Sequence, residues 1–266
     1  MKHLAGLGVA LASVLTSFAT PATGKAPPTA MWRLDCGTYD IDNLEGRGRV
    51  LMPVSCYLIR HGSHLVMFDA GLDAKLYGKP VREREQTLRL DHKLQQQLTQ
   101  IGVDPAKVET LIVSHDHGDH HGQADIFPNA RLVIGAADAA AMRKAGESGA
   151  LAPWLDGKRP VTEVGADLDL RGDRSLVALF TPGHTPGHLS LLVRLGRGRY
   201  ILSGDLVHSR SQLATMRPSG NHVDKERGRA EIERVLRLAD EKKAIIIVGH
   251  DQGDIALLPS FPVAAK

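Results

Sequence analysis

One stretch of eight residues concentrates the side chains that could carry out chemistry. Residues 114–121 read SHDHGDHH and directly follow the apolar run Leu111–Val113. His115 and His117 stand two apart, so both can face one ion, while Asp119 and His120 can face a second site beside it. Imidazole and carboxylate groups are ligands for zinc and other first-row metals. The spacing therefore predicts a metal centre at the open end of a rigid strand.

Three further candidate ligands follow apolar runs in the same way. His184 lies in a Pro-Gly-His turn after Phe180, Asp205 follows Ser203-Gly204, and His250 follows Gly249. Most of these positions adjoin a glycine, which lets the backbone approach closely. Five histidines and two aspartates are enough for two adjacent divalent metals. The predicted ligands are His115, His117, Asp119, His120, His184, Asp205 and His250.

The elements that must position these ligands can be read from the apolar periodicity. Predicted strands cover residues 31–36, 54–60, 65–69, 108–114, 131–134, 161–164, 175–181, 189–194, 200–203 and 244–248. Apolar residues at helical spacing predict helices over 91–101, 136–145 and 225–240, and residues 146–160 have loop composition. Strands with helices at irregular intervals suit two sheets packed together with helices outside them.

Composition excludes several classes of protein. The 266 residues carry 33 Lys+Arg against 30 Asp+Glu, and this net charge of +3 is too small to indicate a nucleic-acid partner. A hydrophobic content of 42% is ordinary for a globular domain. The thirteen histidines exceed the combined number of Phe, Tyr and Trp, which fits the predicted metal centre.

The N-terminus has the order of a secretory signal peptide. A basic head, Met1 to His3, precedes an uncharged apolar run, Leu4 to Ala19, and then small residues. We expect residues 1–24 to be removed, with cleavage after Ala19, Ala22 or Gly24, and residues 25–266 to form a single domain. An uncleaved anchor helix is the alternative, although the run is shorter than the ~20 residues of a membrane span. The mature chain is then periplasmic or secreted, without stable membrane association.

Cys36 and Cys56 are the two cysteines of the chain, and both lie in predicted strands. An exported protein can hold a disulfide, and neighbouring antiparallel strands could bring the two thiols together. We favour the alternative of two buried free thiols.

The joint motif resembles the metallo-β-lactamase superfamily. The similarity rests on HxHxDH at 115–120, then His184, Asp205 and His250, and it extends from about Met31 to the C-terminus, including Phe68-Asp69-Ala70-Gly71. The resemblance implies an αββα sandwich of two mixed β-sheets flanked by helices. It also implies two divalent ions, expected to be Zn²⁺. By position, the first is held by His115, His117 and His184, the second by Asp119, His120 and His250, and Asp205 bridges them.

Within the superfamily, the chain looks most like the N-acyl homoserine lactonases. The similar segments are Leu34–Gly37, Cys56–Gly62, Ser203-Gly204-Asp205 and Gly249-His250-Asp251. The resemblance implies opening of the lactone ring of quorum-sensing signals (quorum quenching) by a metal-bridging hydroxide. Asp119 would then carry a proton to the leaving group. His208 stands where several lactonases have a tyrosine; its imidazole could donate a hydrogen bond to substrate, or could mark a different substrate.

Two alternatives to a lactonase remain. The first is another ester, thioester or β-lactam hydrolase using the same site, and the second is a metal-binding or interaction module without activity. The expected partner is a small lactone or ester, and the sequence does not decide between a monomer and a homodimer.

The other candidate residues receive structural interpretations. We expect His188 to support the ligands or the fold, and His121 to point away from the metals, either supporting a ligand or exposed. We expect Asp69 to orient a ligand loop by hydrogen bonds, and Asp116 to face solvent or bond the backbone. His61, His64, His92 and His222 are expected at the surface, with His222 in a loop that can border the site. An apolar wall for an acyl chain could come from Leu151, Trp154, Leu155, Leu213 and Met216, which could equally pack the core.

Overall fold

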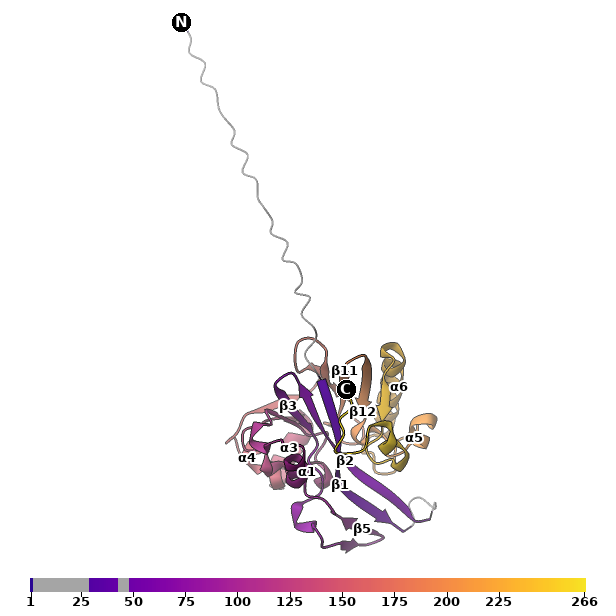
Figure 1. The fold of residues 1–266 in the computed structure, drawn as a ribbon. Helices are drawn as coiled ribbons and strands as arrows, with labels where there is room; N and C mark the ends of the chain where they lie inside the picture. Colours follow the sequence, from indigo (N-terminus) through magenta and orange to yellow (C-terminus); the bar gives the residue numbers. More distant parts are fainter. Residues whose placement is uncertain (2–28, 43–47) are drawn as a thin grey trace.

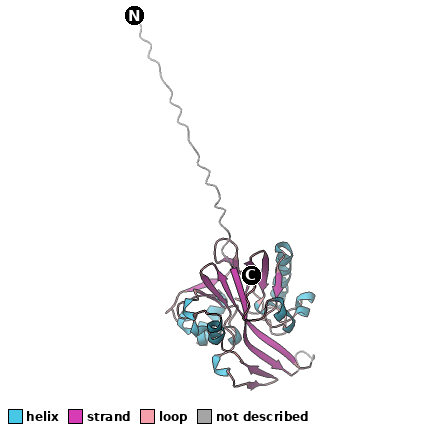
Figure 2. Cartoon of the chain, viewed as in Figure 1, coloured by secondary structure: helices cyan, strands magenta, loops and turns pink. Residues whose placement is uncertain are grey.

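The predicted four-layer αββα architecture is confirmed by a computed structural model, which describes Met1, residues 29–42 and residues 48–266. Two mixed β-sheets face each other, and helices cover their outer faces (Figures 1 and 2). The predicted signal peptide lies outside the described residues, apart from Met1. None of the described helices has the length and apolar content that crossing a membrane requires.

The larger sheet has eight strands in the order β4-β5-β1-β2-β3-β6-β7-β8. Strands β3, β6, β7 and β8 run parallel, and the remaining neighbours are antiparallel. The strands are β1 (Thr29–Ile41), β2 (Val50–His61), β3 (His64–Phe68), β4 (Val81–Glu83), β5 (Gln86–Arg89), β6 (Thr110–Ile112), β7 (Arg131–Gly135) and β8 (Val161–Val164).

The smaller sheet has five strands in the order β13-β12-β11-β10-β9. Its strands are β9 (Leu168–Asp169), β10 (Leu176–Phe180), β11 (Leu189–Leu195), β12 (Gly198–Leu202) and β13 (Ile245–Ile247). Only β12 and β13 are parallel. Their carboxyl ends therefore meet at one edge, facing the carboxyl ends of β3 and β6 in the other sheet.

The helices form the two outer layers. They are α1 (Leu94–Gln100), α2 (Gly118–His121), α3 (Ala136–Ala145), α4 (Ala152–Leu155), α5 (Arg210–Thr215) and α6 (Lys225–Lys242). Helices α1, α3 and α4 lie on the side of the larger sheet, and α5 and α6 on the side of the smaller one (Figure 1). Helix α6 buries one stripe, which contains Ile232, Val235 and Ala239.

The buried apolar side chains form one cluster for each interface between layers. Leu58, Leu111 and Trp154 belong to the cluster beneath the first helix layer. Phe68, Leu191 and Ile247 belong to the cluster between the sheets, and Ile201 packs with α6 in the third cluster. Strands such as β6 are buried on both faces, which explains their uninterrupted apolar runs.

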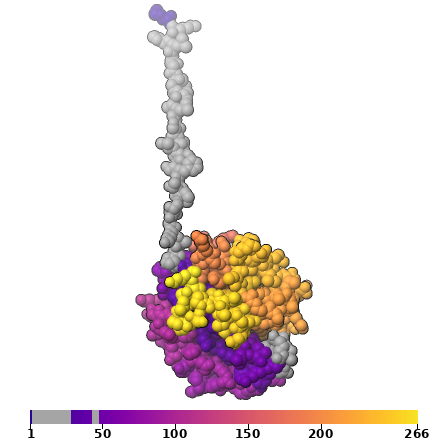
Figure 3. All heavy atoms as spheres, turned by 45° about the vertical axis from the view of Figure 1, so that its right-hand side comes forward, coloured from indigo at the N-terminus to yellow at the C-terminus, as the bar shows by residue number. Residues whose placement is uncertain are grey.

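The C-terminal segment covers one end of the interface between the two sheets, where β1 begins. Ala265 exchanges two backbone hydrogen bonds with Met31 at 2.9 and 3.0 Å, and Trp32 Nε1 donates to the carbonyl of Pro262. Figure 3 shows this last segment lying across the first strands.

Several elements differ from the sequence expectations. The β4–β5 hairpin, the short strand β9 and the helices α2 and α5 were not predicted. The expected loop 146–160 contains α4, and this helix buries Trp154 completely, with Nε1 donating to the carbonyl of Ala130 at 2.7 Å. Leu151, Leu155 and Leu213 are also core residues, and Met216 packs against the third cluster, so none of these five side chains lines the site.

The preference for free thiols was wrong, because Cys36 and Cys56 form a disulfide with a Cα–Cα distance of 5.9 Å. Cys56 pairs with Leu34 across β1 and β2, and a β-bulge between Asp35 and Thr38 shifts the register just beyond it. The bulge brings Cys36 next to Cys56. Alternation of residues alone cannot reveal such an insertion.

Candidate metal centre

The candidate metal centre lies where strand ends of the two sheets converge. Residues 114–121 follow β6, and Asp205 and His250 follow the parallel pair β12 and β13. His184 comes from the turn between β10 and β11. The amide of Leu189 donates to the carbonyl of Ser114 at 2.7 Å and joins this turn directly to the loop that carries His115.

The first candidate group consists of His115, His117, His184 and Asp205. His184 Nε2 lies 3.1 Å from both His115 Nε2 and His117 Nδ1, and the last two atoms are 2.9 Å apart. Asp205 Oδ2 is 3.8 Å from His115 Nε2 and 3.5 Å from His184 Nε2. Four ligands placed tetrahedrally at zinc distances stand about 3.3 Å apart. The separations therefore fit one such ion.

The second candidate group consists of Asp119, His120 and His250. Asp119 Oδ2 is 3.3 Å from His120 Nε2 and 3.5 Å from His250 Nε2. The other oxygen of Asp205, Oδ1, lies 3.3 Å and 3.1 Å from the same two nitrogens. Asp205 thus turns one oxygen to each group, which is the arrangement expected of a bridging carboxylate.

Unpartnered polar atoms supply an independent test of whether metals fit here. Buried polar atoms are nearly always hydrogen-bonded. His120 Nε2 and Asp205 Oδ1 are buried and have no hydrogen-bond partner, although both point into the second group. Because imidazole nitrogen and carboxylate oxygen are ligands for divalent zinc, the residues present fit two metal ions.

The electrostatics differ between the two groups. Burial lowers the pKa of His184 to about 2, and it also lowers the pKa of His115. These rings stay neutral near neutral pH, as metal ligation requires. Burial likewise acts on His120, but Asp119, Asp205 and Asp69 outweigh it and raise its pKa. Carboxylates therefore crowd the second group, which concentrates negative charge suited to a cation.

Hydrogen bonds behind the ligands orient the imidazole rings. Asp69 Oδ2 lies 2.8 Å from His120 Nδ1, and Asp69 Oδ1 accepts from the amide of Ser114 at 2.7 Å, which confirms the orienting role expected for Asp69. His250 Nδ1 donates to the carbonyl of Pro53 at 2.7 Å. His188 Nε2 accepts from the amide of Asp205 at 2.9 Å, so His188 supports a ligand as expected. Such contacts fix the ring nitrogen that faces the metal.

Sequence reasoning missed Asp138 on α3, which ties two ligand loops together. Its carboxylate accepts hydrogen bonds from Thr185 Oγ1 and from the amide of Gly187, both at 2.6 Å. The backbone of Asp116 also lies beside this carboxyl, and burial raises the pKa of Asp138 to about 6. Asp138 therefore holds the turn of His184 against the loop of His115 and His117. An aspartate inside an alanine-rich helix gives no sequence signal of this role.

The remaining histidines divide between the interior and the surface. His121 is buried and bonds the carbonyl of Asp116, away from the metal groups, as expected. His92 is exposed and His64 is half-buried beside Glu109. The expectation of surface positions was wrong for His61 and His222, which are buried. His222 does border the site, since its ring centroid lies 5.2 Å from that of His184.

A cavity of about 590 Å³ opens onto the two metal groups. His117, Asp119, Asp205, His208 and His250 form its base. His208 Nε2 is 3.0 Å from Asp205 Oδ2. The walls come from the first two strands, the β5 edge and the loop before α6, through Tyr39, Ile41, Met52, Gln86, Ser219, Gly220 and Asn221. This wall, Tyr39 included, was not predicted from the sequence.

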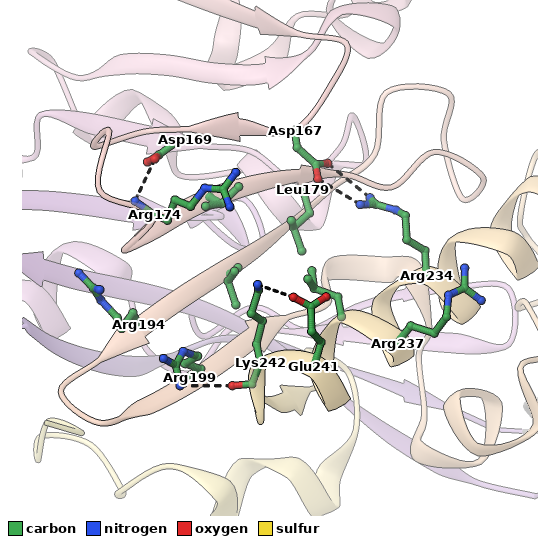
Figure 4. Close-up of a pocket in the computed structure, with 13 residues that line it drawn as sticks. Asp167, Asp169, Arg174, Leu179, Arg194, Arg199, Arg234, Arg237, Glu241 and Lys242 are labelled. Atoms are coloured by element: carbon green, nitrogen blue, oxygen red, sulfur yellow. Dashed lines mark hydrogen bonds and ion pairs between the residues drawn. The ribbon is translucent and has the colours of Figure 1, made fainter.

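A second hollow, of about 690 Å³, lies between α6 and the outer face of the smaller sheet. Figure 4 shows its charged lining, in which Arg234 meets Asp167 and Lys242 meets Glu241. None of the predicted ligands lines this hollow, and many of its charges are already paired with one another. It is therefore separate from the candidate site.

A family model described as the metallo-beta-lactamase superfamily matches residues 49–250, so the chain belongs to that superfamily. An N-acyl homoserine lactonase named AttM, from Azorhizobium caulinodans, is 28% identical over 82% of this chain and 89% of its own length. The N-acyl homoserine lactonase AiiA of Bacillus thuringiensis subsp. kurstaki is 26% identical over 77% of this chain and 84% of its own. The predicted resemblance to both the superfamily and its lactonase branch is confirmed.

Solved structures agree with the fold. An N-acyl homoserine lactone hydrolase with the product N-hexanoyl-L-homoserine bound at its catalytic metal centre superimposes with a TM-score of 0.77 at 21% identity, over 90% of this chain and 99% of that one. AidC, described as a dizinc quorum-quenching lactonase, gives a TM-score of 0.64 at 16% identity, over 90% of each chain.

Proposed function

We propose that this protein is a dinuclear metal-dependent hydrolase that opens the lactone ring of N-acyl homoserine lactones. The observation that carries the proposal is Asp205, whose two oxygens face separate histidine groups at the base of an open cavity. The lactonase relatives, which match along most of the chain, point to the same substrate class.

Two divalent ions at this site, which we propose to be Zn²⁺, would supply Lewis acidity and a water molecule of lowered pKa. The chain's own residues complete the reaction. The carboxylate of Asp119 belongs to the second group and also lines the cavity, where it can receive a proton from water and return it to the leaving alcohol oxygen. Water is thereby added across the ester bond, giving one carboxylic acid and one hydroxyl group.

His208 is the second residue to which we assign a catalytic role. Its ring lines the cavity, with a side-chain exposure of 14%, and its Nε2 is held by Asp205. From this position the imidazole N–H, which Asp205 accepts in this structure, can be donated instead to a carbonyl oxygen of a bound substrate. We expect His208→Ala to lower kcat/KM by about 10- to 100-fold with two metals still bound.

The cavity wall suits an acyl amide. Ile41 and Met52 offer apolar surface for an acyl chain, and Gln86 and Asn221 offer amide groups that can bond its peptide-like linkage. The five apolar residues considered from the sequence are not available for this purpose, since they pack the core.

The test measures acid release by purified, zinc-reconstituted protein from short- and long-chain N-acyl homoserine lactones. We expect the protein to release acid, and we expect this activity to be lost after chelation and in His117→Ala. Because His117 is an exposed ligand, its side chain can be removed without opening the core. His92→Ala is the matched control, because His92 is exposed and lies outside the site. A protein that binds two metals but releases no acid would contradict the lactonase assignment. Aryl esters, thioesters and nitrocefin would then distinguish the alternative hydrolases.

A further inference from the structure

Tyr39 enters the cavity from an element that contains none of the predicted metal ligands. It lies in β1 beyond the bulge at Asp35–Thr38, paired with Met52 on β2 and Leu88 on β5. The extra residue of a bulge changes the face to which the following side chains point. As a result Tyr39 and Ile41 both line the cavity beside the metal groups.

Two contacts fix the tyrosine ring at the second metal group. The ring stands edge-on to His250, with centroids 6.3 Å apart and an interplanar angle of 72°. Its hydroxyl lies beside the carboxylate of Asp119. The phenol hydroxyl carries a proton that it can donate in a hydrogen bond.

The other hydroxyl groups near the site are unsuited to this position. Tyr39 is the only one of the four tyrosines that lines the cavity, all four being within the described residues. Tyr57 is buried between the sheets, and Tyr77 stacks against Lys93 at the surface. The hydroxyl of Ser219 bonds its own loop, through Asn221 at 2.5 Å and His222 at 2.8 Å.

We propose that Tyr39 is a substrate-binding donor whose hydroxyl bonds the leaving oxygen of the scissile ester. This inference rests on the proposed hydrolase function and adds a residue to it. As the carbon–oxygen bond breaks, the leaving oxygen gains negative charge. The Tyr39 hydroxyl stabilises that charge while Asp119 delivers the proton, and Tyr39 itself remains protonated throughout.

The test compares Tyr39→Phe with the wild type on two substrates that differ in the leaving atom. One is N-hexanoyl homoserine lactone, and the other is the corresponding thiolactone, whose thiolate needs little stabilisation. We expect kcat for the lactone to fall about 10- to 100-fold and kcat for the thiolactone to fall less than about threefold. Metal content and Tm should match the wild type. Tyr77→Phe is the control, since it removes the same atom outside the cavity.

An equal loss on both substrates, with both metals retained, would overturn the proposal, because Tyr39 would then act by orienting Asp119. Unchanged kinetics would also overturn it. If the wild type does not cleave the lactone, the proposed substrate fails independently. In that case an alkyl ester and an aryl ester that the wild type does cleave replace the lactone and the thiolactone. The substitution Tyr39→Phe should then lower kcat more for the alkyl ester than for the aryl ester. A metal-loaded wild type that cleaves no ester would overturn both proposals.

Discussion

The two oxygens of Asp205 face different groups of histidines, and no other described side chain spans both. Asp205 Oδ1 lies 3.1 Å from His250 Nε2, and Asp205 Oδ2 lies 3.5 Å from His184 Nε2. Replacing one carboxylate oxygen by an amide nitrogen turns a ligand atom into a hydrogen-bond donor. A single substitution should therefore weaken both metal sites together.

We predict that Asp205→Asn lowers bound zinc from two ions to one or fewer and reduces kcat/KM more than about 100-fold. Elemental analysis of dialysed protein, read together with the acid-release assay, checks both parts. Asp116→Asn is the control, since Asp116 lies in the same motif but belongs to neither metal group. Two tightly bound ions in Asp205→Asn would contradict the bridging assignment.

Site residues that were predicted from the sequence owe their positions to local patterns, whereas those that were missed depend on contacts with distant parts of the chain or on a bulge. The seven predicted ligands follow apolar runs in short, polar, glycine-containing turns, so their types and spacing indicate their role. Asp138 acts through contacts with Thr185 and Gly187, which are nearly 50 positions away. Tyr39 depends on a bulge. Neither long-range pairing nor a bulge has a local signature in a single sequence.

At the scale of elements, α3 connects the two loops of the first metal group through Asp138. Burial raises the pKa of this carboxyl from 3.8 to about 6. Between these values the folded protein binds a proton that the unfolded chain does not. Linkage then requires that stability falls as the pH rises across this interval.

We predict that, in metal-free protein, the free energy of unfolding of the wild type decreases relative to that of Asp138→Asn as the pH rises from 4 to 7. The limit is about 3 kcal/mol, since each pKa unit corresponds to about 1.4 kcal/mol. Urea denaturation at several pH values measures the difference in the free energy of unfolding between the two proteins. Groups that titrate in the same way in both proteins do not contribute to this difference. Asp125→Asn, at an exposed acid, should show no such trend. A constant difference would show that Asp138 has an ordinary pKa.

Elements were predictable where burial gave them a continuous apolar pattern. The strands β6, β7 and β13, and helix α6, were identified within a few residues, since their buried faces repeat with the proper period. All three residues of β4, Val81–Glu83, are exposed, so no apolar pattern distinguishes this strand from a loop. The strand β9 has two half-buried residues and is too short to show a periodic pattern. Edge strands of this kind depend on pairing partners rather than on their own composition.

At the scale of the whole molecule, the disulfide joins the first two strands of the larger sheet. Cys36 and Cys56 are 20 positions apart, and closing a loop of that length restricts the unfolded chain. We predict that replacing both cysteines by alanine lowers the free energy of unfolding by about 3 kcal/mol. Guanidinium denaturation of the wild type and of the double variant measures this change in the free energy of unfolding. Reductant should destabilise the wild type and leave the double variant unaffected, and the reverse pattern would contradict the prediction.

The disulfide also bears on where the protein works, since such bonds persist in oxidising compartments. We predict that the full chain, produced in a Gram-negative host, is recovered from the periplasm and begins after Ala19, Ala22 or Gly24. Fractionation and mass spectrometry of the N-terminus give the result. Leu11→Lys, which places a charge in the apolar run, should keep the protein in the cytoplasm. An uncleaved cytoplasmic product of the unaltered chain would exclude export.

Metal binding should stabilise the whole fold, because the ligands come from both sheets. His115 and Asp119 follow strands of the larger sheet, whereas Asp205 and His250 follow strands of the smaller one. Ions that bind only the folded state therefore link the two sheets. A site filled at 100 times its Kd adds about 2.7 kcal/mol. For a domain of this size that corresponds to roughly 5–10 °C in Tm.

We predict that chelation lowers Tm by about this amount and that added zinc restores it. Calorimetry of the wild type and of Asp205→Asn separates the contribution of the metal from that of the protein alone. The variant has lost the residue that joins both groups, so chelation should change its Tm much less. If chelation leaves the wild-type Tm unchanged while removing two ions, the two sheets hold together without the metals. The ligands would then serve chemistry alone.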